Sequence, residues 1–294
     1  MSSLENHKTI NTLLVVGGEE NLEANVPSGN PGTPSPLAVV PKPEEHRDSR
    51  SSPAMKRILY SLTALAILGG LHHLWVEPIV IKAPFGQTIT TALPDHSIVQ
   101  LNSGTTLTYN RSFGWVDRRV KLNGEAFFIV KGSSQPFEVV TNNSIIKSVN
   151  TKFNVRAWNT EPGKETVVTL VTGKLDFAPK ADPQKSVTLL SGQSSRIVKN
   201  SPQPSEPEIA NVIHTISWRN NGLSFDSQPL SVIFGEMERR YNILIRTTNT
   251  NILQDSLTIF IARPTGPRDV LNNICQAANL KYNTTDKGYI VSRN

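Results

Sequence analysis

The residue types that most often carry chemistry are sparse in this sequence and lie far apart. None of the six histidines is paired with a cysteine or a carboxylate at metal-ligand spacing. His72 and His73 are adjacent, and adjacent helical side chains point apart, so we expect residues at a membrane interface rather than ligands. The glycines form neither a P-loop nor a dinucleotide-binding fingerprint. We therefore expect no enzyme activity, no metal site and no cofactor.

Two further features need a physical interpretation. Cys275 is the only cysteine, so no intrachain disulfide forms. It lies on the apolar stripe of a predicted helix, whereas a reactive thiol needs an exposed, electropositive setting, and we expect core packing. Glu236, Glu238, Arg239 and Arg240 crowd another predicted helix. We interpret them most simply as a solvated helix face, and they are also our candidate partner-binding residues.

A long apolar segment divides the chain. Residues 58–76 contain no Asp, Glu, Lys or Arg, and their number is close to the roughly 20 that a membrane-spanning helix needs. Lys56 and Arg57 flank the segment and predict a cytoplasmic N-terminus, because basic residues stay on that side. A cleaved signal peptide is the alternative, since Ala64 and Ala66 form an A-x-A triplet. That triplet lies in mid-segment behind a long tail, so we predict a permanent single-pass anchor.

The charge balance excludes one class of partner. The formal net charge is +6, but the basic residues are scattered and do not form one patch with aromatic residues between them. We therefore expect no direct nucleic-acid binding. An anionic membrane surface is the simpler counterpart for such a chain.

The chain divides into five segments by composition. Residues 1–57 form a cytoplasmic tail rich in Pro, Ser and charge, which predicts disorder. One apolar island, INTLLVV at 10–16, interrupts the tail; it either orders on a partner or is inert. After the predicted transmembrane helix at 58–76, residues 77–199 form a β domain and residues 200–214 a Pro/Ser linker. Residues 215–294 form a small α+β module.

The fold class predicted from these segments is mainly β. Short runs rich in Val, Ile, Thr and Phe, separated by turn residues, predict an all-β roll, sandwich or barrel over 77–199. In the last segment, helices beginning near Pro229 and Pro267 alternate with short strands. The predicted order there is βαββαβ, with one sheet and a closing hairpin.

The β segment resembles the FecR family of membrane-anchored sigma-factor regulators. The motifs that carry the resemblance are, in order, Leu93 to Asn102 (LPDHSIVQLN), Arg118 to Phe128 (RRVKLNGEAFF), Gln135 to Val139 (QPFEV), Phe153 to Val155 (FNV), Val168 to Lys174 (VTLVTGK) and Ser191 to Gln193 (SGQ). The later motifs resemble the C-terminal module of Bacteroidetes members, which is similar to the short N-terminal domain of secretins and TonB-dependent receptors. These are Trp218, Asn221 to Phe225 (NGLSF) and Glu238 to Asn242 (ERRYN).

The resemblance implies a function. Such proteins lie in the inner membrane with a periplasmic C-terminal part. They respond to an outer-membrane TonB-dependent transporter, through its N-terminal signalling domain, and act as anti-sigma factors on an extracytoplasmic-function sigma factor. Family members usually carry a compact helical sigma-binding domain before the membrane, whereas residues 1–57 show no helical apolar stripe. The alternative is therefore a membrane-tethered periplasmic docking module without sigma-factor activity.

Two positions depart from the family pattern. His96 and Asn150 stand where the family usually has glycine. Some FecR-like proteins cut themselves at a Gly-Thr bond, which corresponds to Asn150-Thr151 here. Attack by a Thr hydroxyl needs a strained and unobstructed peptide, which glycine favours and asparagine hinders. We therefore expect that this chain stays uncut, or is cut far more slowly.

Overall fold

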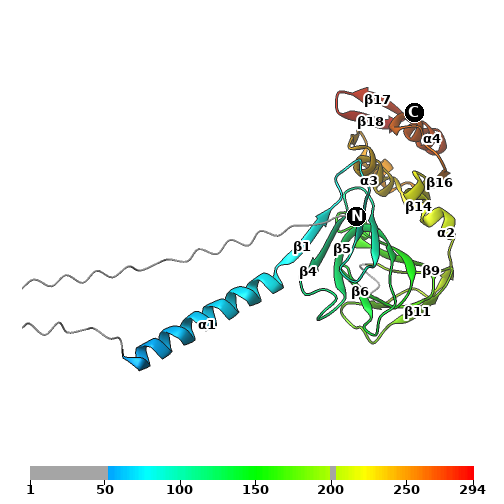
Figure 1. The fold of residues 1–294 in the computed structure, drawn as a ribbon. Coiled ribbons are helices and arrows are strands. Elements are labelled where there is room, and N and C mark those ends of the chain that lie inside the picture. Colours follow the sequence, from blue (N-terminus) through cyan, green and yellow to red (C-terminus); the bar gives the residue numbers. More distant parts are fainter. Residues whose placement is uncertain (1–51, 199–202) are drawn as a thin grey trace, which may run out of the picture. The chain divides into compact units, whose positions relative to one another are not determined.

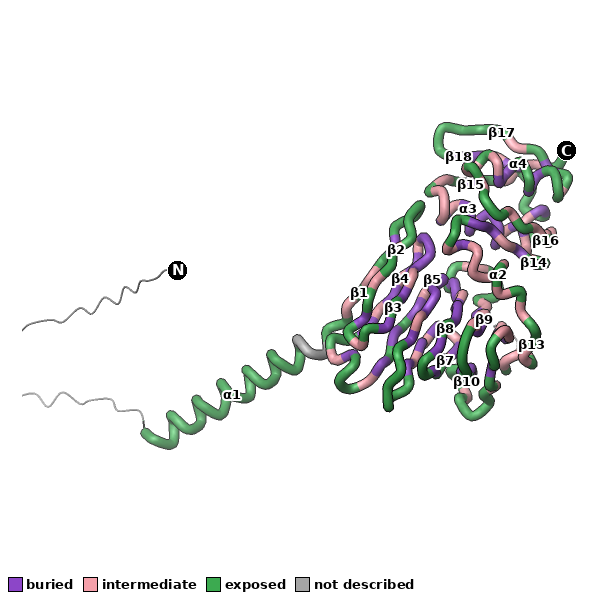
Figure 2. Tube along the Cα trace, turned by 45° about the vertical axis from the view of Figure 1, so that its right-hand side comes forward, coloured by how far each residue is buried: buried purple, intermediate pink, exposed green. Residues whose placement is uncertain are grey.

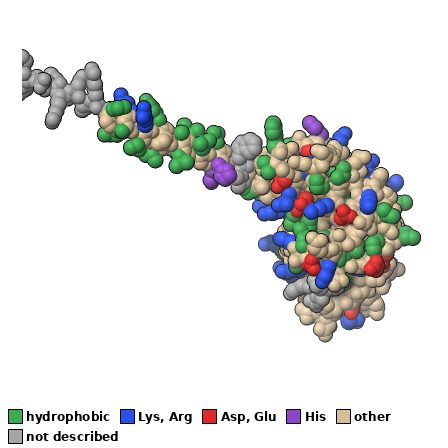
Figure 3. All heavy atoms as spheres, turned by 90° about the horizontal axis from the view of Figure 1, so that it is seen from below, with side chains coloured by type: hydrophobic (Ala, Val, Ile, Leu, Met, Phe, Trp, Pro, Cys, Tyr) green, Lys and Arg blue, Asp and Glu red, His purple; other side chains and the backbone are tan. Residues whose placement is uncertain are grey.

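The computed structural model describes residues 52–198 and 203–294. Most of the predicted tail, including the island at 10–16, lies outside the described residues. Helix α1 (Pro53–Val76) contains the predicted span and begins before it. Its visible face carries hydrophobic side chains along its length, with Lys and Arg near one end and His near the other (Figure 3), and the side chains of residues 53–73 are all exposed (Figure 2). A helix of this kind is typical of a membrane span. By length and composition, residues 53–73 are the candidate span among the described residues.

The β segment folds as predicted into a mainly β structure, here called the β module (Figure 1). Its sheet has the order β11-β10-β7-β6-β5-β8-β9-β12-β13, with the pairs β1–β4 and β2–β3 joined to it at β5. The strands are β1 (Pro78–Lys82), β2 (Ile89–Ala92), β3 (Ile98–Leu101), β4 (Thr106–Asn110), β5 (Arg119–Ile129), β6 (Phe137–Val140), β7 (Ser144–Ser148), β8 (Lys152–Ala157), β9 (Thr166–Thr172), β10 (Lys174–Pro179), β11 (Val187–Leu190) and β12 (Gln193–Ile197). A short 3-10 helix, η1 (Pro162–Lys164), precedes β9.

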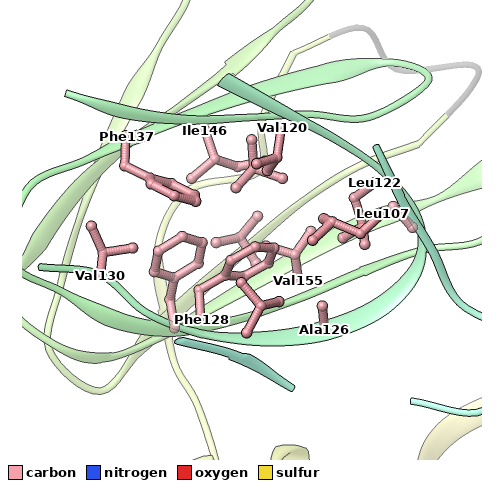
Figure 4. Packing of buried hydrophobic residues seen from close by; sticks show 14 of the residues in the cluster. Leu107, Val120, Leu122, Ala126, Phe128, Val130, Phe137, Ile146 and Val155 are labelled. Carbon is pink, nitrogen blue, oxygen red and sulfur yellow. The ribbon is translucent and has the colours of Figure 1, made fainter. Parts of the chain in front are cut away.

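Strand β5 is the centre of the β module. Its first half pairs with β4 and β6, and its second half pairs with β3 and β8. The change of partners occurs at Gly124, whose φ of +130° and close approach to Thr105 exclude a side chain. Val120 and Phe128, on either side of this point, are both buried in one core (Figure 4). The ring of Phe128 stacks on Phe153 with centroids 5.0 Å apart.

The C-terminal module (residues 215–294) has a hydrophobic core of its own. It consists of η2 (Ser217–Asn220), β14 (Leu223–Pro229), α3 (Leu230–Tyr241), β15 (Leu244–Thr247), η3 (Thr250–Gln254), β16 (Ser256–Ile261), α4 (Pro267–Ala278), β17 (Leu280–Thr285) and β18 (Gly288–Arg293). The closing hairpin supplies two strands, so the order is βαββαββ. The strands form two sheets, β14-β16 and β15-β18-β17, rather than the one expected. The reason is that β15 pairs with β18 in parallel, while β14 pairs only with β16.

The described part of the predicted linker carries secondary structure. Residues 208 and 209 form β13 (Glu208–Ile209), which pairs with β12 at the edge of the large sheet. Helix α2 (Val212–Thr215) follows, and Asn211 caps it by accepting from the backbone N–H of His214. The domain boundaries predicted from composition stay predictions.

Candidate functional site: a buried polar network between the modules

Helix α3 buries two different faces. Leu230, Ile233 and Met237 are fully buried in the core of the C-terminal module, at helical spacing. Glu236 and Arg239 are also buried, with exposed fractions of 5% and 7%. The interpretation that these two side chains belong to a solvated face is wrong, because this second face of α3 packs on the β module.

The other two candidate residues on α3 bond within the C-terminal module. Both are half-buried. Glu238 accepts a hydrogen bond from the backbone N–H of Ile245 at 2.8 Å, and Arg240 donates to the carbonyl of Gly222 at 2.9 Å. These hydrogen bonds join α3 to β15 and to the residue that precedes β14.

Asn102 connects the two modules directly. Its amide nitrogen donates to Glu125 Oε2 at 2.9 Å and to Glu236 Oε1 at 3.1 Å. The second oxygen of Glu125 accepts from the amide of Asn154 at 2.9 Å. The carbonyl oxygen of Asn154 in turn accepts from the indole N–H of Trp218 at 3.1 Å. One chain of hydrogen bonds thus runs from β5 and β8 to α3 and η2.

Arg239 extends this network through charge pairs. Its Nη2 lies 2.9 Å from a carboxylate oxygen of Glu236 and 2.9 Å from one of Glu161. Its guanidinium also lies over the ring of Trp158, 3.9 Å from the centroid, which adds a cation–π contact. Arg156 binds Glu161 through two hydrogen bonds of 2.6 and 2.7 Å. The positive charges of Arg156 and Arg239 therefore balance the negative charges of the Glu161 and Glu236 carboxylates.

A second contact lies beside the network. Arg219 of η2 donates to the side chain of Gln100 on β3. Its guanidinium lies 3.9 Å from the centroid of the Phe127 ring on β5. Burial lowers the pKa of Arg219, but the group remains a cation at physiological pH.

The carboxyl group of Glu125 is the unusual acid of the network. Burial raises its pKa to about 7, and the nearby Glu236 carboxylate adds to this increase. Arg156 and the amides of Asn154 and Asn102 act in the opposite direction. The two amide donors favour an ionised acceptor, whereas the dry surroundings favour the neutral acid. Glu125 is thus balanced to exchange a proton near neutral pH.

Its neighbours in the network stay charged. Burial alone works to raise the pKa of Glu236, but Arg239 and Arg156 outweigh it and hold that pKa below its usual value. For Arg156, burial works to lower the pKa, and Glu161 with Glu125 more than reverses this effect. The carboxylates and amides described above bond to other members of the network. The arrangement therefore joins the two modules and holds one exchangeable proton. Glu125, Arg156 and Glu236 also line a cavity of about 640 Å³.

Most of the network comes from residues that the sequence motifs contain. Asn102 ends the first motif, Glu125 lies in GEAFF, and Asn154 is the middle residue of FNV. The sequence signal was a polar residue inside an otherwise apolar strand, which is costly unless it is hydrogen-bonded. Trp158 and Glu161 follow β8 in a loop and carry no comparable signal.

The other sequence-predicted residues lie elsewhere. Lys56 and Arg57 are exposed near the start of α1. The prediction that Cys275 packs in a core is confirmed, since it is 4% exposed and burial raises its pKa to about 11. Within residues 52–198 and 203–294, no three His, Cys, Asp or Glu side chains gather as metal ligands would.

The two positions that depart from glycine both adopt the left-handed backbone conformation. His96 has φ of +64° and Asn150 has φ of +53°. His96 lies in the turn between β2 and β3, where Asp95 accepts from the backbone N–H of Ser97 at 2.9 Å. Asparagine and histidine are among the residues that tolerate this region best after glycine, so both turns keep the required geometry.

The comparisons with known proteins agree with this architecture. The family described as FecR protein matches residues 79–193, and the family described as FecR, C-terminal matches residues 222–291. Two crystal structures, each described as "a putative anti-sigma factor" from Parabacteroides distasonis, share the fold with TM-scores of 0.67 and 0.66. Each is 24% identical and covers 74% of this chain, which spans 100% and 99% of those chains. No curated protein matches the sequence. The two family matches, covering both modules in order, show that this chain belongs to the FecR family.

Proposed function

We propose that this protein is a single-pass inner-membrane signal transducer that acts as an anti-sigma factor on an extracytoplasmic-function sigma factor. Residues 1–57 lie in the cytoplasm and residues 77–294 in the periplasm. Family membership and the candidate membrane helix support this proposal. The observation that carries it is the buried network, because it couples α3 to the β module, and only Glu77 separates β1 from α1.

The proposed periplasmic partner is the N-terminal signalling domain of an outer-membrane TonB-dependent transporter. We place its contact on the C-terminal module, with Glu236, Glu238, Arg239 and Arg240 as candidate residues. Since Glu236 and Arg239 are buried against the β module, a partner that binds them must first separate α3 from that module. Breaking these contacts in response to the transporter would then be the signal.

A second candidate function is a periplasmic docking module that does not affect transcription. The sequence of residues 1–57 favours it, because it contains many prolines and no helical apolar stripe. The two functions differ in one interaction, between this tail and a sigma factor.

Two measurements test the proposal. A peptide of residues 1–57 should capture one of the host's extracytoplasmic-function sigma factors, whereas a peptide with Leu13→Asp and Val15→Asp in the apolar island should not. Deleting residues 215–294 should abolish the transcriptional response to the transporter while the protein stays in the membrane. Absence of any captured sigma factor would favour the docking function, and an unchanged response in the deletion would remove the partner contact from this module.

A further inference from the structure

The loop between β4 and β5 carries an apolar tip that the chain leaves uncovered. Trp115 and Val116 are 81% and 65% exposed. Tryptophan contributes more hydrophobic area than any other side chain and is highly buried on average in soluble domains. Exposed apolar side chains that are adjacent at a loop tip are typical of a surface that contacts something outside the chain.

The tip is held in a defined conformation by a buried aromatic neighbour. Phe113, two residues before Trp115, is fully buried. Its ring lies 5.4 Å from the ring of Tyr109 and 5.9 Å from that of Phe137, both in edge-to-face geometry. The loop is thus anchored in the core of the β module.

Backbone hydrogen bonds close the loop on itself. The N–H groups of Trp115 and Val116 both donate to the carbonyl of Ser112 at 3.0 Å, and Gly114 donates to the carbonyl of Asp117 at 2.7 Å. The turn is therefore formed before any contact is made. A preorganised tip loses less conformational entropy on binding than a flexible one.

The strand pairing places this loop next to the end of the membrane helix. Strand β1 lies beside β4 (Figure 1) and pairs with it in antiparallel register, in which Pro78 is opposite Asn110. Pro78 is two residues beyond Val76, the last residue of α1, which allows a separation of at most about 7 Å. Asn110 lies about 5 Å further across the ladder. Because β4 runs antiparallel to β1, the chain after Asn110 continues toward the helix end.

The length of the apolar segment places this junction at the membrane surface. Residues 58–76 extend over about 28 Å as a helix, close to the roughly 30 Å thickness of the hydrocarbon core. The helix end therefore lies at the boundary of that core. The single residue between α1 and β1 leaves no flexible tether that would let the β module move away.

We propose that Trp115 and Val116 insert into the interfacial layer of the same bilayer that α1 spans. The partner is a lipid surface, at the level where headgroups meet acyl chains. This is the layer in which tryptophan is enriched in membrane proteins. Arg111 is exposed at the base of the loop. With the tip inserted, its guanidinium is at the level of the lipid phosphates. Because α1 already holds the loop beside the bilayer, insertion is an intramolecular event and needs little intrinsic affinity.

This inference rests on the proposed membrane anchor, so the experiment reports on both. Full-length protein with Cys275→Ala is reconstituted into phosphatidylethanolamine/phosphatidylglycerol vesicles, and a nitroxide label is attached to one new cysteine at a time. The positions are Val116→Cys at the tip, Leu65→Cys within α1 and Ile209→Cys on β13. Ile209 is the matched control, because it is an apolar residue of the β module that is 93% exposed.

The readout is the collision of each label with oxygen, which concentrates in lipid, and with a water-soluble nickel complex. The label at 116 should collide more with oxygen and less with nickel than the label at 209. Adding Trp115→Ser should bring both collision rates of the label at 116 closer to those at 209. A label at 116 as water-accessible as that at 209, with the label at 65 inside the bilayer, would overturn this inference and leave the anchor intact. A label at 116 that is shielded only after a protein partner is added would overturn it as well. If the label at 65 is itself in water, the anchor and this inference both fail.

Discussion

At the residue scale, the protonation of Glu125 makes the stability of the fold depend on pH. Its pKa near 7 in the folded chain lies above the ordinary value of 4.5. Between these two values the folded state holds more protons than the unfolded state, so the contribution of Glu125 to the free energy of unfolding decreases as the pH rises. This contribution is complete below about pH 4.5 and lost above about pH 7. Glu236 has a lowered pKa, so its contribution is lost only in more acidic solution.

We therefore predict that Glu125→Gln flattens the pH dependence of stability. The unfolding free energy of the unmodified chain should be greater at pH 5 than at pH 8, by an amount on the order of a few kcal/mol. The variant should lose most of this difference and be less stable at pH 5, because an amide donor faces the donors of Asn102 and Asn154. Urea unfolding at both pH values measures the change. Glu138→Gln, a surface ion-pair residue, is the control, and an equal slope in all three chains would contradict the assignment.

The bond between Asn150 and Thr151 is the second residue-scale feature with a consequence. Asn150 supplies the left-handed conformation that the turn requires, but it keeps a side chain beside the carbonyl that a hydroxyl would attack. The Thr151 hydroxyl is buried and has no hydrogen-bond partner among the described residues. Without a base to take its proton, a hydroxyl is a weak nucleophile.

We predict that the chain remains intact at this bond. An immunoblot of protein tagged at the C-terminus should show full-length material. Asn150→Gly is the substitution expected to increase cutting, and Asn150→Gly with Thr151→Val should abolish any cutting that appears. A dominant fragment beginning at Thr151 in the unmodified chain would show that glycine is not required.

At the scale of elements, α3 carries two neighbouring arginines in different surroundings. Arg239 lies between two buried carboxylates and over Trp158. Arg240 is half-buried and donates to the backbone of Gly222. Both changes to alanine remove the same charge and nearly the same volume from the same helix.

We predict that Arg239→Ala destabilises the chain by roughly 3–5 kcal/mol, because it leaves Glu161 and Glu236 short of their countercharge in a buried site. Arg240→Ala should cost only about 1 kcal/mol. Urea unfolding of the two variants gives the comparison directly. Equal effects would mean that the contact between α3 and the β module is open in solution.

At the scale of the whole molecule, the part of the chain that the structure describes has one candidate membrane helix, which precedes both folded modules. Lys56 and Arg57 lie near its N-terminal end, so the proposed topology puts the modules outside the cytoplasm. We predict that protease added to spheroplasts digests residues 77–294 and that the same protease leaves them intact in cells with a sealed outer membrane. Protection of the C-terminus in spheroplasts would reverse the orientation.

Features that depend on local composition and periodicity could be predicted from the amino-acid sequence. The apolar segment at 58–76 predicted a helix able to span a membrane, because length and absence of charge decide this without any partner. Alternating Val, Ile, Thr and Phe predicted the β module, and the apolar stripe through Ile274 predicted the buried position of Cys275. The motifs around Glu125 predicted the family.

The tertiary structure alone decided which charged residues are buried. The spacing of Glu236 and Arg239 on α3 fits a solvated face as well as it fits a second packed face, since helical periodicity does not show what lies opposite. Asn102, Glu125, Glu161 and the two α3 residues come from segments far apart in the sequence. They meet only because β5 changes its partners at Gly124 and α3 packs on the β module. The exposure of Trp115 was decided in the same way, because Phe113 anchors the loop in the core while backbone hydrogen bonds close a turn that leaves Trp115 exposed.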